Sequence, residues 1–91
     1  METPELQQLY RRYQRYERLA KQYNAVLDEC TGDPLVHLVI DPVHRTLTPV
    51  LRLARHAVAI PKSIPRDRPT AWYVAKYIEY QAKADNAHEL Y

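Results

Sequence analysis

Apolar positions recur along the first third of the chain at alternating spacings of three and four residues. Every position of this series is apolar or aromatic: Leu6, Leu9, Tyr13, Tyr16, Ala20, Tyr23, Leu27 and Cys30. Such spacing is typical of one face of an amphipathic helix. Thr3 and Pro4 supply a capping oxygen and a residue suited to the first helical turn, and Gly32 can end a helix in the left-handed conformation. The pattern predicts a long helix over about residues 4–30.

A second long helix is predicted over about residues 69–89, where aromatic residues again recur with helical spacing. All eight tyrosines and the single tryptophan lie in these two segments or at the chain end. We therefore expect the two outer helices to pack directly on each other, within one chain or across a homodimer. The expected seam consists of Leu6, Leu9, Tyr13, Tyr16, Tyr23, Leu27, Trp72, Tyr73, Tyr77 and Tyr80.

The segment between these helices is harder to assign, because an apolar run at residues 35–40 fits either a buried strand or a short helix. Two Asp-Pro pairs, at 33–34 and 41–42, resemble helix starts, and a lone strand would leave its amides without partners. We expect short helices over about 34–47 and a central helix over about 49–60, whose apolar residues nearly encircle it. Prolines at every fourth position then predict an extended, basic strap over 61–68.

These elements together predict an all-α fold, in which long N-terminal and C-terminal helices flank short central helices in a small bundle. A single glycine in 91 residues argues against an architecture rich in tight hairpin turns. This length suits one modest core, so residues 1–91 are expected to form a single domain.

The charge distribution is more informative than the formal net charge of +2. Nine of the thirteen basic residues are arginine, which suits bidentate contact with carboxylates or phosphates. One group lies on the first helix, where Arg11, Arg15 and Arg18 fall on the face opposite the seam, and a second spans the central helix and the strap. The predicted partner-binding residues are Arg11, Arg12, Arg15, Arg18, Arg52, Arg55, Arg66 and Arg68.

Signals for catalysis or metal binding are nearly absent. Ser63 is the only serine and stands in no nucleophile motif, and adjacent carboxylates at 28 and 29 would point about 100° apart on a helix. His37, Asp41 and His44 could align on one helical face, but the proline at 42 breaks that helix. We predict no enzyme, no catalytic residue, no metal, no cofactor and no small-molecule substrate.

Cys30 and the N-terminal sequence bear on the compartment. The only cysteine falls on the apolar stripe, so we expect it to be a small buried residue and form no internal disulfide. No run approaches the roughly 20 apolar residues that span a bilayer, and the acidic start does not resemble a signal peptide. These features predict a cytoplasmic protein with no membrane partner.

The sequence as a whole predicts a small helical protein-protein interaction module that occupies a partner's surface through its Arg-rich and Tyr-rich helices. An adaptor, an assembly factor or a phage-type inhibitor of a larger complex would have these features. The alternative is a nucleic-acid-binding protein, in which the first helix, the central helix and the strap form one basic surface. That alternative requires the two arginine groups to merge in space.

Overall fold

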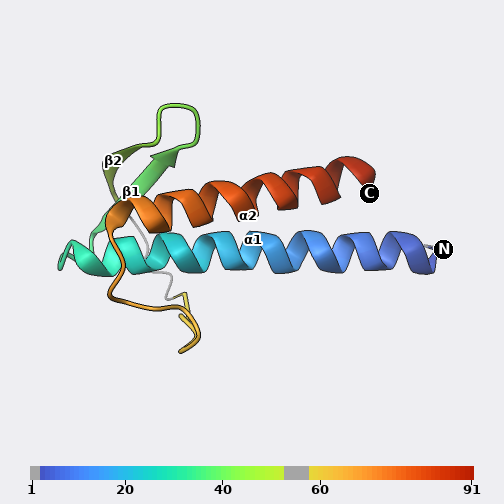
Figure 1. Ribbon diagram of the computed structural model, residues 1–91, viewed down its shortest axis with the longest axis horizontal. Helices are drawn as coiled ribbons and strands as arrows, with labels where there is room; N and C mark the ends of the chain where they lie inside the picture. Colours follow the sequence, from blue (N-terminus) through green and yellow to red (C-terminus); the bar gives the residue numbers. More distant parts are fainter. Residues whose placement is uncertain (1–2, 53–57) are drawn as a thin grey trace.

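Two antiparallel helices and one β-hairpin make up the computed structural model, which describes residues 3–52 and 58–91 (Figure 1). The elements follow in the order α1 (Pro4–Cys30), β1 (Val36–Asp41), β2 (Thr46–Leu51) and α2 (Thr70–Leu90). The helices lie side by side with both chain termini at one end. The hairpin stands at the opposite end, where α1 finishes and α2 begins.

Local sequence accounts for the bounds of both helices. The Thr3 side chain accepts a hydrogen bond from the backbone N–H of Leu6 at 3.2 Å, with proline in the first turn of α1. At the other end Gly32 has a φ of +72°, the left-handed conformation that follows many helix ends. Proline 69 is extended and immediately precedes α2. These are the two long helices that the apolar spacing predicts.

The prediction of an all-α bundle is wrong. Residues 34–47 contain no helix, because β1 pairs with β2 in an antiparallel hairpin whose register runs from Val36 opposite Leu51 to Asp41 opposite Thr46. The expected central helix over 49–60 also fails, since residues 49–51 belong to β2 and 58–60 are not helical, while 53–57 lie outside the described residues. Each apolar run supplies the partner that the other needs for its amides.

The hairpin makes its turn without glycine, which explains why the low glycine content was misleading. Arg45 adopts a positive φ of 56°, and its N–H donates to the backbone oxygen of Asp41 at 2.8 Å. An Asp41 carboxylate oxygen accepts the N–H groups of Val43 and His44 at 2.9 and 3.2 Å. The Asp41 side chain thus stabilises this turn through hydrogen bonds to backbone N–H groups, and no glycine is needed.

Both edges of the hairpin are protected against further strand pairing. The N–H of Arg52 donates to the oxygen of Leu35, and the antiparallel alternation therefore turns the nitrogen of Pro49 outward. Proline carries no N–H, so the β2 edge lacks a donor there. On β1 the N–H of Leu38 donates to an Asp28 carboxylate oxygen of α1 at 2.8 Å.

The core lies where the hairpin, the strap and both helices meet. Its buried members are Val26, Leu27, Ile40, Ile64, Tyr73 and Val74. The strap residues 61–68 are not helical, and Ile64 anchors them in this core with an exposed fraction of 4%. Tyr73 holds the strap as well, because its hydroxyl donates to the backbone oxygen of Pro65.

Aromatic rings fill the seam between α1 and α2, within a single chain. Tyr23 stacks on Tyr80 with ring centroids 5.6 Å apart, and Tyr16 lies 6.1 Å from the same ring. Farther along, Tyr13 contacts His88 at 5.1 Å. Three fully or nearly fully buried alanines, Ala20, Ala84 and Ala87, let the helices approach between these rings. Cys30 departs from its prediction: it is exposed, because the stripe has run past the end of the seam.

Candidate functional site

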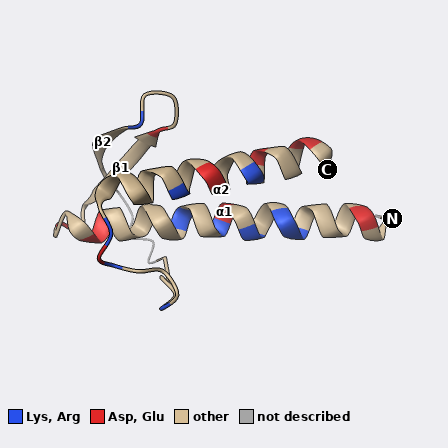
Figure 2. Cartoon of the chain, in the orientation of Figure 1, with Lys and Arg blue, Asp and Glu red and all other residues tan. Residues whose placement is uncertain are grey.

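Four arginines of the first basic group form an exposed patch on α1, which we call the arginine face: Arg11, Arg12, Arg15 and Arg18. Figure 2 shows basic residues gathered along the middle of this helix. Within the described chain, none of the four makes a side-chain hydrogen bond or an ion pair. Glu17, the acid among them in sequence, instead holds Lys21 at 2.9 Å. The arginine face therefore carries uncompensated positive charge.

The second basic group is occupied by contacts inside the protein. Arg52 is half-buried and its guanidinium lies 2.5 Å from an Asp28 carboxylate oxygen. Arg66 pairs with Glu29 at 2.9 Å, and the Arg68 guanidinium lies over the Trp72 ring at 5.9 Å. Arg55 falls outside the described residues. The structure thus separates the predicted partner-binding arginines into a free set on α1 and a set engaged near the hairpin.

Asp28 joins α1 to β1 and to Arg52, the residue that follows β2. One carboxylate oxygen accepts the N–H of Leu38, and the other contacts the His37 ring at 2.7 Å and Arg52. The side chain of Asp28 is only 12% exposed, so these contacts are largely shielded from water. Sequence reasoning missed this role, because the three partners come from residues 9 to 24 positions away and no local pattern connects them.

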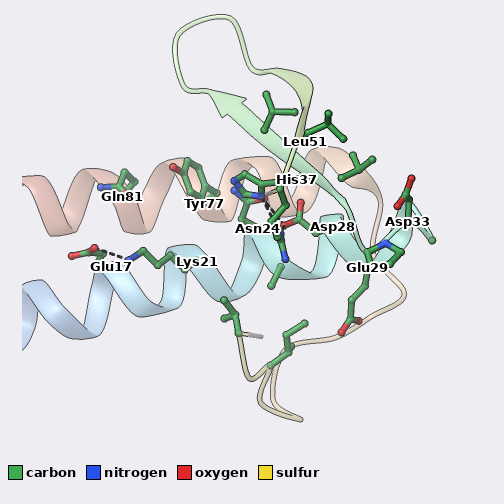
Figure 3. Close-up of a pocket in the computed structure, with 18 residues that line it drawn as sticks. Glu17, Lys21, Asn24, Asp28, Glu29, Asp33, His37, Leu51, Tyr77 and Gln81 are labelled. Carbon is green, nitrogen blue, oxygen red and sulfur yellow. Dashed lines mark hydrogen bonds and ion pairs between the residues drawn. The ribbon is translucent and has the colours of Figure 1, made fainter. Parts of the chain in front are cut away.

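An open groove of about 940 Å³ lies beside Asp28, between α1, the hairpin and residues 58–60 (Figure 3). Its described lining includes acids and bases of α1, aliphatic residues of the hairpin, and Tyr77 of α2. Asn24 lies in this lining with an exposed fraction of 7%, and its side-chain oxygen has no hydrogen-bond partner among the described residues. Nothing in the sequence marks Asn24, which sits between the seam positions Tyr23 and Leu27.

The histidines considered for a metal site are separated in the structure. His37 bonds to Asp28, whereas His44 pairs with Asp41 in the hairpin loop at 2.8 Å. In the part of the chain that the structure describes, no three potential ligands cluster in a way that could hold a metal ion. These residues instead act as two separate Asp–His pairs.

The Asp41–His44 pair in the hairpin loop lowers the pKa of Asp41. Hydrogen bonds from the His44 side chain, then from the backbone N–H groups of His44 and Val43, lower this pKa below its ordinary value. A carboxyl with a lowered folded pKa stabilises the loop above its unfolded pKa of about 3.9, and this contribution disappears as pH falls through the folded value. We expect His44→Ala to raise the pKa of Asp41 toward the ordinary value. NMR titration of the side-chain carboxyl carbon tests this, and an unchanged pKa in the variant would contradict it.

Comparisons with known proteins found no matching family, no similar curated protein and no similar solved structure. None of the described helices is long and apolar enough to cross a membrane. The arginine face and the groove are therefore the candidate functional surfaces.

Proposed function

We propose that this chain is a protein-interaction module whose arginine face docks on an acidic surface of a partner protein. The observation that carries the proposal is the state of Arg11, Arg12, Arg15 and Arg18, which are exposed and, among the described residues, have no acidic partner. Lys21, Arg52 and Arg66 each pair with an acid, and the exposed bases Arg45 and Lys62, which also lack an acidic partner among the described residues, lie outside α1. A carboxylate-rich surface would supply the missing partners in the bidentate geometry that arginine favours.

The energetics indicate how such a face would work. A single exposed ion pair contributes about 0–1 kcal/mol, so the four arginines have to act together. Complementary charge also speeds association and orients the partner, and both effects weaken as salt increases. Arg11, Arg15 and Arg18 lie at helical spacings of four and three, within about 10 Å along the axis at 1.5 Å per residue. This short, rigid row suits a compact acidic patch.

Nucleic acid is the alternative partner, and the position of the second basic group weighs against it. A continuous phosphate track needs the two groups to merge, but Arg52 and Arg66 are paired with Asp28 and Glu29. Phosphates approaching that end would meet these carboxylates as well as the arginines. Tyr13, Tyr16 and Tyr23 contact rings of α2 in the seam, and of the α1 tyrosines only Tyr10 is exposed, so few ring platforms are available for stacking on bases. A homodimer through the seam is not part of the proposal, because α1 already packs there on α2.

The test compares two charge reversals of equal size in the tagged protein, expressed in its native host. After nuclease treatment, the double variant Arg11→Glu with Arg15→Glu should recover about tenfold less of the protein partner. It loses two hydrogen-bonded charge contacts of ~1 kcal/mol each, which is enough for a change of this size. The control, Arg45→Glu with Lys62→Glu, changes two other exposed bases and should leave recovery within about twofold.

A salt titration with duplex DNA, single-stranded DNA and RNA separates the two partner classes. We expect that the protein does not bind these nucleic acids with an affinity that falls steeply as the salt concentration rises. Strong salt-dependent binding that Arg11→Glu with Arg15→Glu abolishes would replace the protein partner with nucleic acid. If both charge-reversed variants recovered equal amounts of the protein partner, the arginine face would be ruled out as its binding surface.

A further inference from the structure

A small pocket lies over the seam between α1 and α2, toward the end where both chain termini lie (Figure 1). We call it the seam pocket. Its volume is about 190 Å³, and its lining includes Leu9, Arg12 and Tyr16 of α1 and Lys83, Asn86 and Leu90 of α2. At roughly 30 Å³ per water molecule this space holds about six waters, and it is smaller than the roughly 300 Å³ of the smallest typical ligand pockets. The seam pocket therefore suits a single side chain rather than a whole small molecule.

The charge of the seam pocket favours an acidic occupant. Among its described lining residues, two are cations, Arg12 and Lys83, and none is a carboxylate. A guanidinium and an ammonium group can only donate hydrogen bonds, and the side-chain amide of Asn86 adds two more N–H donors. A carboxylate accepts hydrogen bonds from all three groups and carries the complementary charge. The pocket therefore matches a carboxylate better than a neutral or basic group.

Arg12 differs from the other residues of the arginine face in the side of α1 that it occupies. It follows Leu9 by three positions and precedes Tyr16 by four, and both of these residues line the seam pocket. Arg11 lies about 100° away around the helix axis. Arg12 is exposed and pairs with no acid of the described chain. It therefore connects the arginine face to the seam pocket.

Lys83 lies over the seam and keeps N–H donors for a further acceptor. Its ammonium is 5.7 Å from the ring centroid of Tyr16 and 5.0 Å from that of Tyr80. The carboxylate of Glu79 lies 3.6 Å away, farther than the roughly 2.7–3.2 Å of a good hydrogen bond, and Glu79 also pairs with Lys76. Because a lysine ammonium has three N–H donors, an acid in the seam pocket can bind Lys83 without displacing these contacts.

The leucines of the seam pocket favour a protein side chain over a free inorganic anion. Leu90 is 63% exposed, and Leu9 is partly buried beside it in the same lining. The methylene groups of an aspartate or glutamate side chain can cover these leucines while the carboxylate faces the two cations. A hydrated inorganic anion has no such groups and would leave Leu90 in water.

We propose that one aspartate or glutamate side chain of the partner protein inserts into the seam pocket, where it binds Arg12 and Lys83 and anchors the acidic surface that docks on the arginine face. This inference rests on the function proposed above and adds the residues that anchor the interface. A carboxylate held between two cations in a pocket is screened less by salt than the fully exposed pairs of Arg11 and Arg15. Lys83, which is not among the bases predicted from the sequence, thereby becomes a binding residue.

The experiment uses the full chain and a phage-displayed library of random dodecapeptides. Selection should enrich peptides that carry Asp or Glu, and one enriched peptide is synthesised with a fluorescent label for anisotropy measurements. Each of its acidic residues is then replaced in turn by the matching amide. One of these replacements should weaken binding to the parent protein by about tenfold, because hydrogen bonds between charged groups are lost. The same replacement should change binding to Arg12→Gln with Lys83→Gln by less than about twofold, since the cations that hold this carboxylate are already absent.

The matched control is Arg15→Gln with Lys76→Gln, which also removes one arginine of α1 and one lysine of α2. Lys76 resembles Lys83 closely: it pairs with Glu79 at 3.5 Å and lies 5.5 Å from an aromatic ring centroid, but it does not line the seam pocket. In this control the replacement in the peptide should still weaken binding by about tenfold, whatever the contribution of Arg15 to the overall affinity.

NMR of the parent protein locates the bound peptide. Its addition should shift the side-chain amide signals of Asn86 and the backbone amide signal of Leu90, which both line the seam pocket. The proposal is overturned if no acidic peptide is enriched, if every replacement keeps its full effect in Arg12→Gln with Lys83→Gln, or if these signals do not shift. In the last two cases, a peptide that Arg11→Glu with Arg15→Glu still weakens would leave the arginine face as the binding surface. Failure of the seam pocket is thus distinguishable from failure of the proposed function.

Discussion

Replacing Tyr73 by alanine is expected to lower the free energy of unfolding by about 3–5 kcal/mol, the usual cost of removing a large buried aromatic ring. Tyr73 is 1% exposed and packs edge-on against Trp72 with ring centroids 5.1 Å apart. Its hydroxyl also holds the strap through the oxygen of Pro65. A domain of this size is stabilised by only about 5–14 kcal/mol, so the variant should lose a large fraction of its stability. Urea denaturation followed by circular dichroism measures the loss.

Tyr73→Phe separates the ring from the hydroxyl. Phenylalanine keeps the packing and removes the hydroxyl, which donates to the oxygen of Pro65 and accepts the N–H of Arg68 at 3.4 Å, so the expected loss is about 1–2 kcal/mol. Equal losses for Tyr73→Phe and Tyr73→Ala would mean that the ring does not contribute to the core. A loss below about 1 kcal/mol for alanine would contradict the buried position of Tyr73.

Replacing Asp28 by alanine is expected to cost about 2–4 kcal/mol, because it leaves three donors without their acceptor at once. These are the N–H of Leu38, the ring of His37 and the guanidinium of Arg52. Removing one member of a shielded ion pair costs more than an exposed pair would contribute, since the remaining charge stays partly buried. The hairpin should loosen first, because Asp28 holds β1 and Arg52, the residue that follows β2, on α1. Amide hydrogen exchange should accelerate in β1 and β2 more than in the middle of α1.

Glu29→Ala is the matched control, one residue along the same helix. Glu29 pairs with Arg66, but both side chains are about half exposed, at 56% and 51%. An exposed pair of this kind contributes about 0–1 kcal/mol, so the substitution should stay within about 0.5 kcal/mol of the parent protein. If the two alanine variants had equal effects, the Asp28 contacts would not hold the hairpin on the helix.

Tyr73 and Asp28 stabilise different parts of the molecule. Tyr73 stabilises the junction of the strap and α2, which supports the helix pair and hence the rigid arginine face. Asp28 places the hairpin against α1, and that placement creates the groove beside Asn24. An Asp28→Ala variant should therefore loosen the hairpin while the arginine face on α1 stays intact.

Helix positions could be predicted from the sequence because they depend on nearby residues. Heptad spacing, the cap at Thr3 and the left-handed Gly32 all act within one or two turns, and they account for α1 with the bounds Pro4–Cys30. The direct packing of the outer helices also followed from composition, since rings that recur on two helices need each other for burial. The exposed position of Arg11, Arg15 and Arg18 could be predicted from the same periodicity.

The hairpin and the groove could not be predicted, because they depend on residues far apart in the chain. Local propensity at Asp33-Pro34 and Asp41-Pro42 favoured helix starts, and only pairing between residues 36–41 and 46–51 makes extended backbone favourable there. Arg52 looked like a free base until folding brought it to Asp28, 24 positions earlier. The unpaired oxygen of Asn24 is likewise a property of its buried surroundings. Periodicity reports which side of a helix a residue occupies, whereas hydrogen-bond partners and charge pairs arise only when separate elements meet.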